Sequence, residues 1–482
     1  MKRYIRKSFF FLMLIFLTSV HSDCSKKTNN QNGNAPGLPD SNNIIFWATK
    51  ADQTVLLQKQ SSLLAFGSPN ASAQTIEVDS NQHFQTIDGF GYTLTGGSAF
   101  LINKMNASPK SSLIQLLFGN GNDAIGVSYL RLSIGASDLN ETVYSYDDMP
   151  TGETDTSLSH FSLAEDTVDV IPLLKQILAI NPNIKILGSP WSPPAWMKDN
   201  ESSIGGSLLT QYYSVYAKYF VKYIQAMKSN GITIDAVTIQ NEPQNGGNNP
   251  SMVMSALQEA DFIKNNLGPA FAAAGISSKI IIWDHNCDNP NYPITILNDP
   301  DANKFVNGSA FHLYAGDISA LSVVHNAFPI KDLYFTEQWT GSSGSFNGDL
   351  QWHIKNVIIG SMLNWSKTAL EWNLASDPSF SLHTPGGCSQ CKGAITIGGS
   401  SYIKNVGFYI IAHASKFVLQ GSVRIGSTVI TGLSNVAFLR PDGKKVLIAL
   451  NDGTTDISFN IKFDGKQNTT LLPAGTVGTY IW

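Results

Sequence analysis

Two glutamates in this sequence, Glu242 and Glu337, directly follow short runs of mainly apolar residues. The run before Glu242 covers residues 237–241 and ends in Asn241, and the run before Glu337 covers residues 333–336. Two carboxyl groups at one site can divide the work of catalysis when one holds a proton and the other is ionised. The protonated group is then a general acid, and the ionised group is a nucleophile or a general base.

Other polar and aromatic side chains follow apolar runs in the same way. Carboxyl groups beside indole rings suit sugar chemistry, because two carboxyls can cleave a glycosidic bond while indole faces stack on the apolar faces of a sugar ring. This wider set is Arg131, Asp138, Trp191, Trp196, Asp284, His285, Asn286, His312, Tyr314, Gln338, Trp339, Glu371, Trp372 and Asn373.

The elements that carry these residues alternate between short apolar runs and longer amphipathic stretches, a pattern typical of parallel strands with crossover helices. Eight candidate strands match the number that closes a (β/α)8 TIM barrel. The strands are expected at residues 89–93, 126–133, 184–189, 236–241, 280–284, 308–312, 333–336 and 368–372, and helices at 168–180, 209–229, 254–274 and 351–363.

Reacting side chains of such a barrel lie at the carboxyl ends of its strands. Glu242 and Glu337 would end the fourth and seventh strands, which face each other across a barrel of eight. Their carboxyl groups could then lie about 5 to 5.5 Å apart, the separation at which one glutamate is the nucleophile and configuration is retained.

Alternation and turn residues indicate β-structure outside the barrel, in residues 44–84 and 420–482. Both segments are too short to be stable alone, so we infer that they pair into one β-sandwich beside a catalytic barrel at residues 85–419. Turn residues at 441–443, 451–453 and 464–465 predict hairpins between the later strands.

The N-terminus has the charged and then apolar layout of a secretory signal, which predicts a signal peptide at residues 1–23 and an exported protein. Cleavage before Asp23 and lipid attachment at Cys24 remain equal alternatives, and the second would tether the protein to a membrane. Residues 24–43 are rich in Asn, Gly and Pro and are expected to form a flexible tether. No later segment is long and apolar enough for a transmembrane helix.

The composition argues against disorder and against a nucleic acid partner. Charged residues make up 14% of the 482 residues, hydrophobic residues 43%, and the net charge is -4. The oligomeric state is not indicated.

Four cysteines are too few for a disulfide framework. Cys388 and Cys391 could form a local disulfide or half of a metal site. A disulfide or a pair of plain thiols is favoured over the metal site, because no second pair of ligands is evident. Cys287 has no evident partner.

Several motifs in order resemble glycoside hydrolase family 30, the family of acid β-glucosidase (glucosylceramidase). The resemblance spans residues 44–482. It rests on QTIDGFG at 85–91, SPWSPPAWM at 189–197, NEP at 241–243, FTE at 335–337 and EWNLA at 371–375, with further similarity at 408–417 and 440–443.

The resemblance makes Glu242 the acid/base and Glu337 the nucleophile, and it implies a barrel with an attached β-sandwich and no metal or organic cofactor. Glu371 stands where glucosylceramidase has Asp, a mild departure. The implied substrate-binding residues are Asn241 at the 2-hydroxyl, Asp138 and Trp191 at the non-reducing hydroxyls, Trp372 as a stacking floor, and Arg131, His312 and Tyr314 near the nucleophile.

Each of these secondary roles has a structural alternative. Trp191 and Trp372 could fill the core. Arg131 could pair with a buried carboxylate and set the ionisation of the nucleophile. His312 could be a hydrogen-bonded core histidine. Asp284 and His285 receive no role.

We therefore expect a retaining β-glycosidase that hydrolyses glucosylceramide-type β-glucosides, with Glu242 kept protonated by nearby negative charge and partial burial. A β-1,6-glucanase acting on glucan chains is the alternative enzyme. A non-catalytic sugar-binding protein is the alternative of another class, and the presence of both carboxylates argues against it. The substrate would accordingly be a β-glucoside, a glycolipid or a β-glucan.

Overall fold

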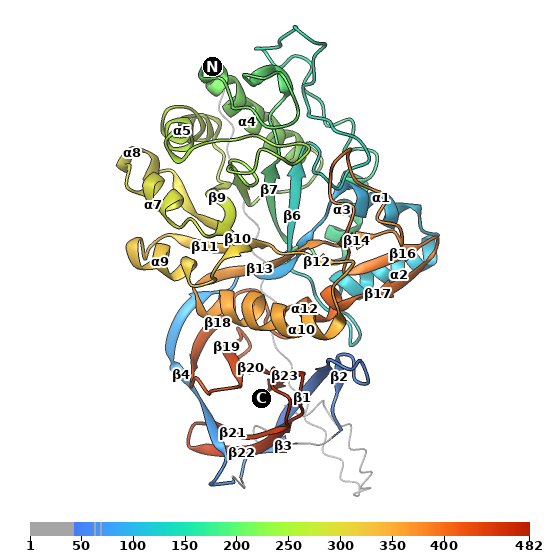
Figure 1. Ribbon diagram of the computed structural model, residues 1–482, viewed down its shortest axis with the longest axis vertical. Coiled ribbons are helices and arrows are strands. Elements are labelled where there is room, and N and C mark those ends of the chain that lie inside the picture. The colour runs from blue at the N-terminus through green and yellow to red at the C-terminus, as the bar shows by residue number, and fades with distance from the viewer. Residues whose placement is uncertain (1–42, 62–63, 68–69) are drawn as a thin grey trace, which may run out of the picture. The chain divides into compact units, whose positions relative to one another are not determined.

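The computed structural model describes residues 43–61, 64–67 and 70–482. Within these residues, eight parallel strands close into a barrel, and each of the eight predicted runs overlaps one of them (Figure 1). In barrel order the strands are β5 (Gly89–Thr93), β6 (Tyr129–Ile134), β7 (Lys185–Pro190), β8 (Ala236–Thr238), β9 (Lys279–Cys287), β10 (Val306–Gly316), β11 (Asp332–Glu337) and β13 (Ser366–Asn373).

Amphipathic helices connect the barrel strands and bury one stripe each, as α3 (Val170–Ile180) does with Val170, Leu173, Leu174 and Ile177. Two longer helices pass through π-helical segments, at Ile263–Leu267 and Ile354–Gly360. The remaining helices are α1 (Gly96–Lys104), α2 (Ala107–Phe118), α4 (Tyr213–Ser229), α5 (Ala256–Phe262), α6 (Gly268–Ala274), α7 (Asn291–Leu297), α8 (Pro300–Asn303), α9 (Ala320–Ala327), α10 (Phe346–His353), α11 (Ser361–Leu363) and α12 (Val406–Ser415).

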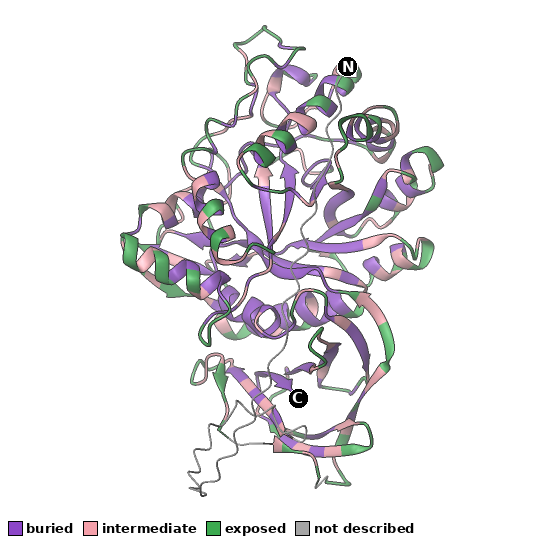
Figure 2. Cartoon of the chain, turned by 180° about the vertical axis from the view of Figure 1, so that it is seen from behind, coloured by how far each residue is buried: buried purple, intermediate pink, exposed green. Residues whose placement is uncertain are grey.

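The barrel interior is layered, and Figure 2 shows its strands as mostly buried. One apolar cluster takes a side chain from each of seven strands: Tyr129, Leu187, Ala236, Ile281, Ala310, Tyr334 and Leu370. Side chains of a strand alternate between its two faces, so the residue two positions further on points inward again. That next inward layer contains Arg131, Ser189, Thr238, His312, Thr336 and Trp372. The layer above the apolar floor is therefore largely polar.

Three register shifts change which side chains point inward near the strand ends. In the pairing of β10 with β9, Trp283 and His285 have partners on β10 and Asp284 between them has none. In the pairing of β10 with β11, Phe335 and Glu337 have partners and Thr336 between them has none. Between β13 and β5 it leaves Trp372 over. Bulges of this kind re-aim side chains at barrel rims.

A second sheet combines strands from both ends of the described chain. Its order is β2-β1-β23-β20-β19-β18-β4-β21-β22, with β3 also paired to β1. A separate apolar cluster that includes Phe46, Ile76, Phe459 and Tyr480 forms its core. The strands are β1 (Asn43–Lys50), β2 (Gln58–Lys59), β3 (Leu64–Ala65), β4 (Gln74–Thr86), β18 (Val423–Ser427), β19 (Ser434–Leu439), β20 (Lys445–Asn451), β21 (Ile457–Phe463), β22 (Lys466–Leu472) and β23 (Thr476–Ile481).

The predicted hairpin at residues 451–453 is wrong. The turns at 441–443 and 464–465 join the antiparallel pairs β19–β20 and β21–β22. Strand β20 already pairs with β19 and β23, so both of its edges are taken, and the chain after it crosses over to pair β21 in parallel with β4.

The buried side chain of His413 fastens helix α12 to this second sheet. Its Nδ1 lies 2.9 Å from Thr479 Oγ1 on β23, and its Nε2 lies 2.8 Å from Thr49 Oγ1 on β1. Burial lowers the pKa of His413 to about 3, so the ring is neutral at ordinary pH.

The predicted signal peptide, the tether and Cys24 lie outside the described residues. Among the described helices, none is long and apolar enough to cross a membrane.

Replacing His413 by Ala should lower the free energy of unfolding by about 2–4 kcal/mol, because it opens a cavity and removes one hydrogen bond from each of two buried threonine hydroxyls. Urea unfolding at pH 7 measures the change. The exposed His83 on β4 provides the control, because His83→Ala should change stability by less than about 0.5 kcal/mol.

The stability difference between the wild type and His413→Ala should shrink as pH falls from about 6.5 towards 3. The unfolded chain protonates His413 near its ordinary pKa of 6.5, whereas the folded chain does so only near 3. The unfolded state therefore binds more protons in this interval, and acid removes the contribution of His413. A difference that is constant over the interval would show that His413 is not buried as a neutral ring.

Candidate active site

The carboxylate of Asp284 is the centre of the polar layer and is fully buried. Its Oδ2 accepts hydrogen bonds from Arg131 Nη2 at 2.8 Å and from the hydroxyls of Ser189 and Thr238 at 2.7 and 2.8 Å. Its Oδ1 accepts from the hydroxyl of Thr336 at 2.6 Å and lies 3.1 Å from His312 Nε2. Asp284 thus has partners on five strands of the barrel besides its own, β9.

Arg131 forms ion pairs with both Asp284 and Glu337. The guanidinium is fully buried, donates to Glu337 Oε2 at 2.5 Å through Nη1, and donates to Asn241 Oδ1 at 2.7 Å through Nη2. It also lies over the ring of Trp191, with its Cζ 4.8 Å from the ring centroid. The hydroxyl of Tyr314 donates to the other oxygen of Glu337 at 2.9 Å. Both oxygens of Glu337 are therefore held in place.

His312 contacts both Asp284 and Glu242. Its Nδ1 lies 3.1 Å from Glu242 Oε1 while its Nε2 faces Asp284. Asn245 donates to Glu242 Oε2 at 2.8 Å. Glu242 itself lies beyond the end of β8 with a φ of 47°, and its N–H donates to the carbonyl of Asp284 at 3.0 Å. The two catalytic candidates are thus tied to one carboxylate through two different cations.

The charges of this cluster shift the pKa values of its members. Burial raises the pKa of Glu242, but the hydrogen bond and charge of His312 outweigh burial and lower it to about 2. Burial lowers the pKa of His312, yet the charge of Glu337 and the bonds to Asp284 and Glu242 raise it to about 9. Burial raises the pKa of Glu337, and the charges of Glu242 and Asp284 add to this rise while His312 and Arg131 oppose it.

The expected protonation of Glu242 by nearby negative charge is therefore not what the free site shows. The proton shared by Glu242 and His312 lies on the imidazole because the charge of Glu337 and the hydrogen bond to Asp284 stabilise the imidazolium. Transfer along the 3.1 Å hydrogen bond would give a protonated Glu242 and a neutral ring that still donates to Asp284. The pair can thus act as one acid.

The spacing of the two glutamates fits retention. One carboxylate oxygen of each and one ring nitrogen of His312 lie within 4.8 Å of one another. Inverting enzymes separate their carboxyl groups by about 6.5–9.5 Å, whereas retaining enzymes bring them to about 5–5.5 Å.

A cavity of about 430 Å³ opens directly onto both glutamates. Its polar lining suits a ligand rich in hydroxyl groups, and its indoles suit sugar-ring faces. The lining residues are Asp138, Trp191, Asn241, Glu242, Asn245, Asn248, His285, Asn286, Tyr314, Glu337, Trp339, Trp372, Cys388 and Cys391.

Seven of the nine residues predicted for the site line this cavity, and Arg131 and His312 do not. We expected these two to bind substrate. Both have no exposed surface, because the polar layer buries them below the glutamates, and each contacts a catalytic carboxylate instead. For Arg131 this is the structural alternative that its sequence left open.

The sequence prediction assigned no specific role to three residues of the site. Asp284 received no role, although it is the common partner of Arg131 and His312. Trp339 and Asn245 line the cavity from loops that follow the glutamates. The signal that could have identified Trp339 and Asn245 is their polar or aromatic type just after Glu337 and Glu242. The only signal for Asp284 is its place at a strand end.

Cys388 and Cys391 form a disulfide, so the metal alternative for this pair is wrong. The free Cys287 is buried.

Comparisons with known proteins identify the family. Residues 87–418 match the glycosyl hydrolase family 30 TIM-barrel domain, and residues 421–480 match the family 30 beta sandwich domain. The chain belongs to glycosyl hydrolase family 30. It is therefore a glycosidase with the barrel and β-sandwich of that family.

Relatives of this family 30 glycosidase include two kinds of enzyme. An endo-1,6-beta-D-glucanase of Aspergillus fumigatus is 35% identical over 86% of this chain and 88% of its own length. The lysosomal acid glucosylceramidase of Mus musculus is 31% identical over 84% of this chain and 83% of its own. A solved endo-β-1,6-glucanase superposes with a TM-score of 0.85 and 34% identity over 91% of this chain and 99% of that one.

Replacing Asp284 by Asn should lower kcat/KM by about 10²-fold, because it loosens the support of both glutamates at once. It should also move both limbs of the pH profile of kcat/KM to lower pH. Asp284 raises the pKa of Glu337, the candidate nucleophile, and the pKa of His312, which shares a proton with the candidate acid Glu242. Removing the negative charge lowers both values.

Ser189→Ala is the matched control, because it removes one donor to Asp284 without changing the charge. Its pH profile should keep both limbs in place. An Asp284→Asn enzyme with unshifted limbs would contradict the electrostatic role of Asp284.

Proposed function

We propose that this family 30 enzyme is a retaining glycosidase that cleaves β-1,6-linked glucan, with Glu337 as nucleophile and Glu242 as acid/base. The supporting observation is the polar character of the cavity next to Glu242. Asn245, Asn248, His285 and Asn286 line this cavity, and Asn245 donates to Glu242 at 2.8 Å. The leaving group sits beside the acid, so a sugar leaving group finds hydrogen-bonding partners that a lipid chain would not use.

The named activities of the relatives support the same substrate. Endo-1,6-beta-D-glucanases from three fungi are 34–35% identical over 86–90% of this chain, whereas the glucosylceramidases are 30–32% identical over 78–84% of it. Glucosylceramide is the competing substrate, and the similarity to mouse acid glucosylceramidase supports it.

The mechanism takes two steps at the anomeric carbon. Glu337 attacks this carbon while the proton shared by His312 and Glu242 passes to the leaving oxygen through Glu242. The leaving group carries that proton away, and the sugar stays bound to Glu337 as an ester. Glu242 then takes a proton from water, whose oxygen displaces Glu337 and restores the original configuration.

The other predicted residues would hold the sugar during these steps. Asn241, fixed by Arg131 at 2.7 Å, would bind the 2-hydroxyl, where hydrogen bonds strengthen in the transition state. Asp138 and Trp191 would bind the hydroxyls at the non-reducing side. Trp372 would form the stacking floor, and its ring already stacks on Trp191 with centroids 5.3 Å apart.

We also propose that the protein is exported, on the basis of the basic and then apolar residues at its N-terminus. Either signal cleavage before Asp23 or lipid attachment at Cys24 would place the enzyme where a polymeric glucan can reach it.

On equal molar amounts of bonds, the enzyme should hydrolyse β-1,6-glucan at least tenfold faster than glucosylceramide in detergent micelles, and it should leave β-1,3-glucan intact. Release of reducing ends measures the rates on the two glucans, and mass spectrometry of the released lipid measures the rate on glucosylceramide. A higher rate on glucosylceramide would contradict the proposed substrate and leave the two-glutamate mechanism standing. Binding of all these substrates without hydrolysis would instead support the non-catalytic alternative.

Glu337→Ala should abolish hydrolysis of a dinitrophenyl β-glucoside, and azide should restore turnover with formation of the α-glucosyl azide. Azide then attacks from the face that the nucleophile has vacated. Glu242→Ala should keep activity on this good leaving group, lose about 10²–10⁴-fold on β-1,6-glucan, and give the β-glucosyl azide. Exchange of the two azide products between the variants would reverse the assigned roles.

A further inference from the structure

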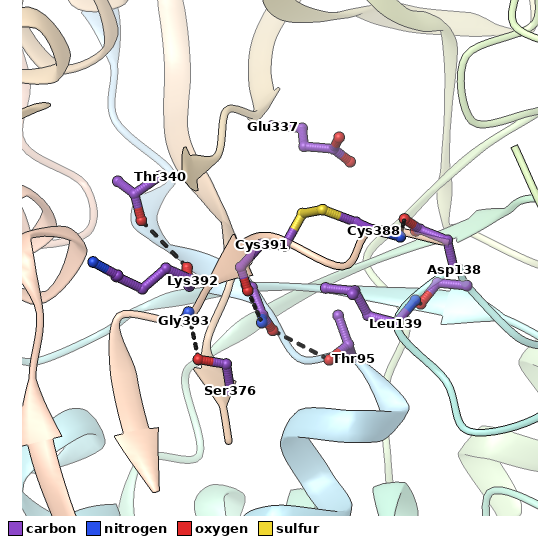
Figure 3. The surroundings of a disulfide bond; sticks show 12 residues. Thr95, Asp138, Leu139, Glu337, Thr340, Ser376, Cys388, Cys391, Lys392 and Gly393 are labelled. Atoms are coloured by element: carbon purple, nitrogen blue, oxygen red, sulfur yellow. Dashed lines mark hydrogen bonds between the residues drawn. A yellow bond between two sulfur atoms is a disulfide. The ribbon is translucent and has the colours of Figure 1, made fainter. Parts of the chain in front are cut away.

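Residues 384–391 form a loop that we call the cysteine loop, because the Cys388–Cys391 disulfide closes its second half. The disulfide is part of the cavity wall, and Cys391 packs in one apolar cluster with Leu139, Trp191 and Trp372. Figure 3 shows the disulfide between Asp138 on one side and the short strand that contains Lys392 on the other. The mechanism proposed above uses none of these loop residues.

The cysteine loop holds Asp138 by its backbone and by its side chain. The N–H of Thr384 donates to the carbonyl of Asp138 at 2.9 Å, and the N–H of Cys388 donates to the carboxylate oxygen Oδ2 at 3.3 Å. Gly387 lies so close that a Cβ atom there would meet the Asp138 carbonyl at 2.4 Å. A glycine is therefore required for this approach.

The same loop is anchored to the ends of three other strands. The hydroxyl of Thr384 donates to the carbonyl of Asn249 in the loop that follows Glu242. Strand β15 (Cys391–Lys392) pairs with β12 (Thr340–Gly341), just beyond Glu337. The side chain of Asn373, at the end of β13, donates to the carbonyl of Cys391 at 3.2 Å. Cys391 is therefore the fixed end of the disulfide.

Cys388 is at the other end, next to glycines that place little restriction on the backbone. Gly386 has a φ of 83°, and Gly387 follows it directly. Such a segment has many conformations open to it, and a covalent link across three residues removes most of them. Because Cys391 is fixed, the disulfide also restricts Cys388, whose N–H faces Asp138.

We propose that the Cys388–Cys391 disulfide is a specificity-determining element, which presents the carboxylate of Asp138 to the non-reducing hydroxyls of the sugar bound at the site of cleavage. This inference rests on the proposed role of Asp138 in substrate binding. The cysteines act through Asp138 and do not touch the reacting atoms. Their contribution should be the same in the ground state and the transition state, so it should appear in KM more than in kcat.

The test compares dinitrophenyl β-glucoside with its 3-deoxy, 4-deoxy and 6-deoxy analogues. The wild type should prefer the parent over at least one analogue by tenfold or more, because a buried carboxyl group loses its hydrogen bond to the sugar when the hydroxyl is missing. Asp138→Asn should lose most of this preference. The double variant Cys388→Ser with Cys391→Ser should lose at least half of the same preference on a logarithmic scale, with KM for the parent raised about tenfold and kcat changed by less than threefold.

Two single variants guard against a trivial loss of folding. Gly387→Ala keeps the disulfide but forces the loop away from Asp138, so it should reproduce the loss of preference. Ser389→Ala alters an exposed side chain between the two cysteines and should behave as the wild type. Thermal unfolding of each variant shows which are folded, and Gly387→Ala alone decides the matter if the double variant is not.

The outcomes separate the two proposals. If Asp138→Asn loses the preference and the folded cysteine or Gly387 variants keep it, the inference about the disulfide is wrong and the role of Asp138 stands. If Asp138→Asn keeps the preference for every hydroxyl, the proposed role of Asp138 is wrong and the inference fails with it. Equal loss of activity on the parent and all analogues would reduce the disulfide to a purely structural role.

Discussion

The buried carboxylate of Asp284 is the interaction on which the rest of the site depends. A carboxylate with no exposed surface must be paired and hydrogen-bonded, or its burial would cost several kcal/mol. Arg131, His312 and three hydroxyls meet this need. The two cations also reach past Asp284, Arg131 to Glu337 and His312 to Glu242. One buried anion thus sets both the positions of the catalytic glutamates and the charges beside them.

Charge balance explains why the two glutamates differ although both are buried. The cluster contains the carboxylates of Asp284, Glu242 and Glu337 against the cations Arg131 and His312. The excess of negative charge keeps a proton on His312, next to an oxygen of the candidate acid Glu242. Burial and the charge of Glu337 also raise the pKa of Asp138 to about 7. Asp138 can therefore pass between hydrogen-bond donor and acceptor near neutral pH.

Alternation of apolar runs was enough to predict the eight barrel strands and the position of Glu337, because Glu337 is the last residue of its strand. It could not reveal Asp284. Alternation along the strand predicts that Trp283, two residues after the inward Ile281, also points inward. Trp283 instead packs in a different apolar cluster from Ile281, and the bulge lets Asp284 point inward. The sequence left two positions open for Arg131 and His312, because whether a side chain lies in the cavity or just below it depends on layers contributed by other strands. The crossing from β20 to β21 was missed because a turn motif does not show that both edges of a strand are already paired.

The backbone around Asp284 shows that stability is given up to build this cluster. Trp283, Asp284 and Glu242 have φ values of 75°, 55° and 47°, which side chains other than glycine seldom adopt and which cost about 1–3 kcal/mol each. Glycine or asparagine would relieve the strain at any of these positions. Only a carboxylate can pair with Arg131 and His312 at 284 or pass a proton at 242. The strained residues also support one another, because the N–H of Glu242 donates to the carbonyl of Asp284. The geometry that brings Glu242, His312 and Glu337 together is therefore maintained by the same ion pairs that tune their charges, and a change that relaxes the backbone would also alter those charges.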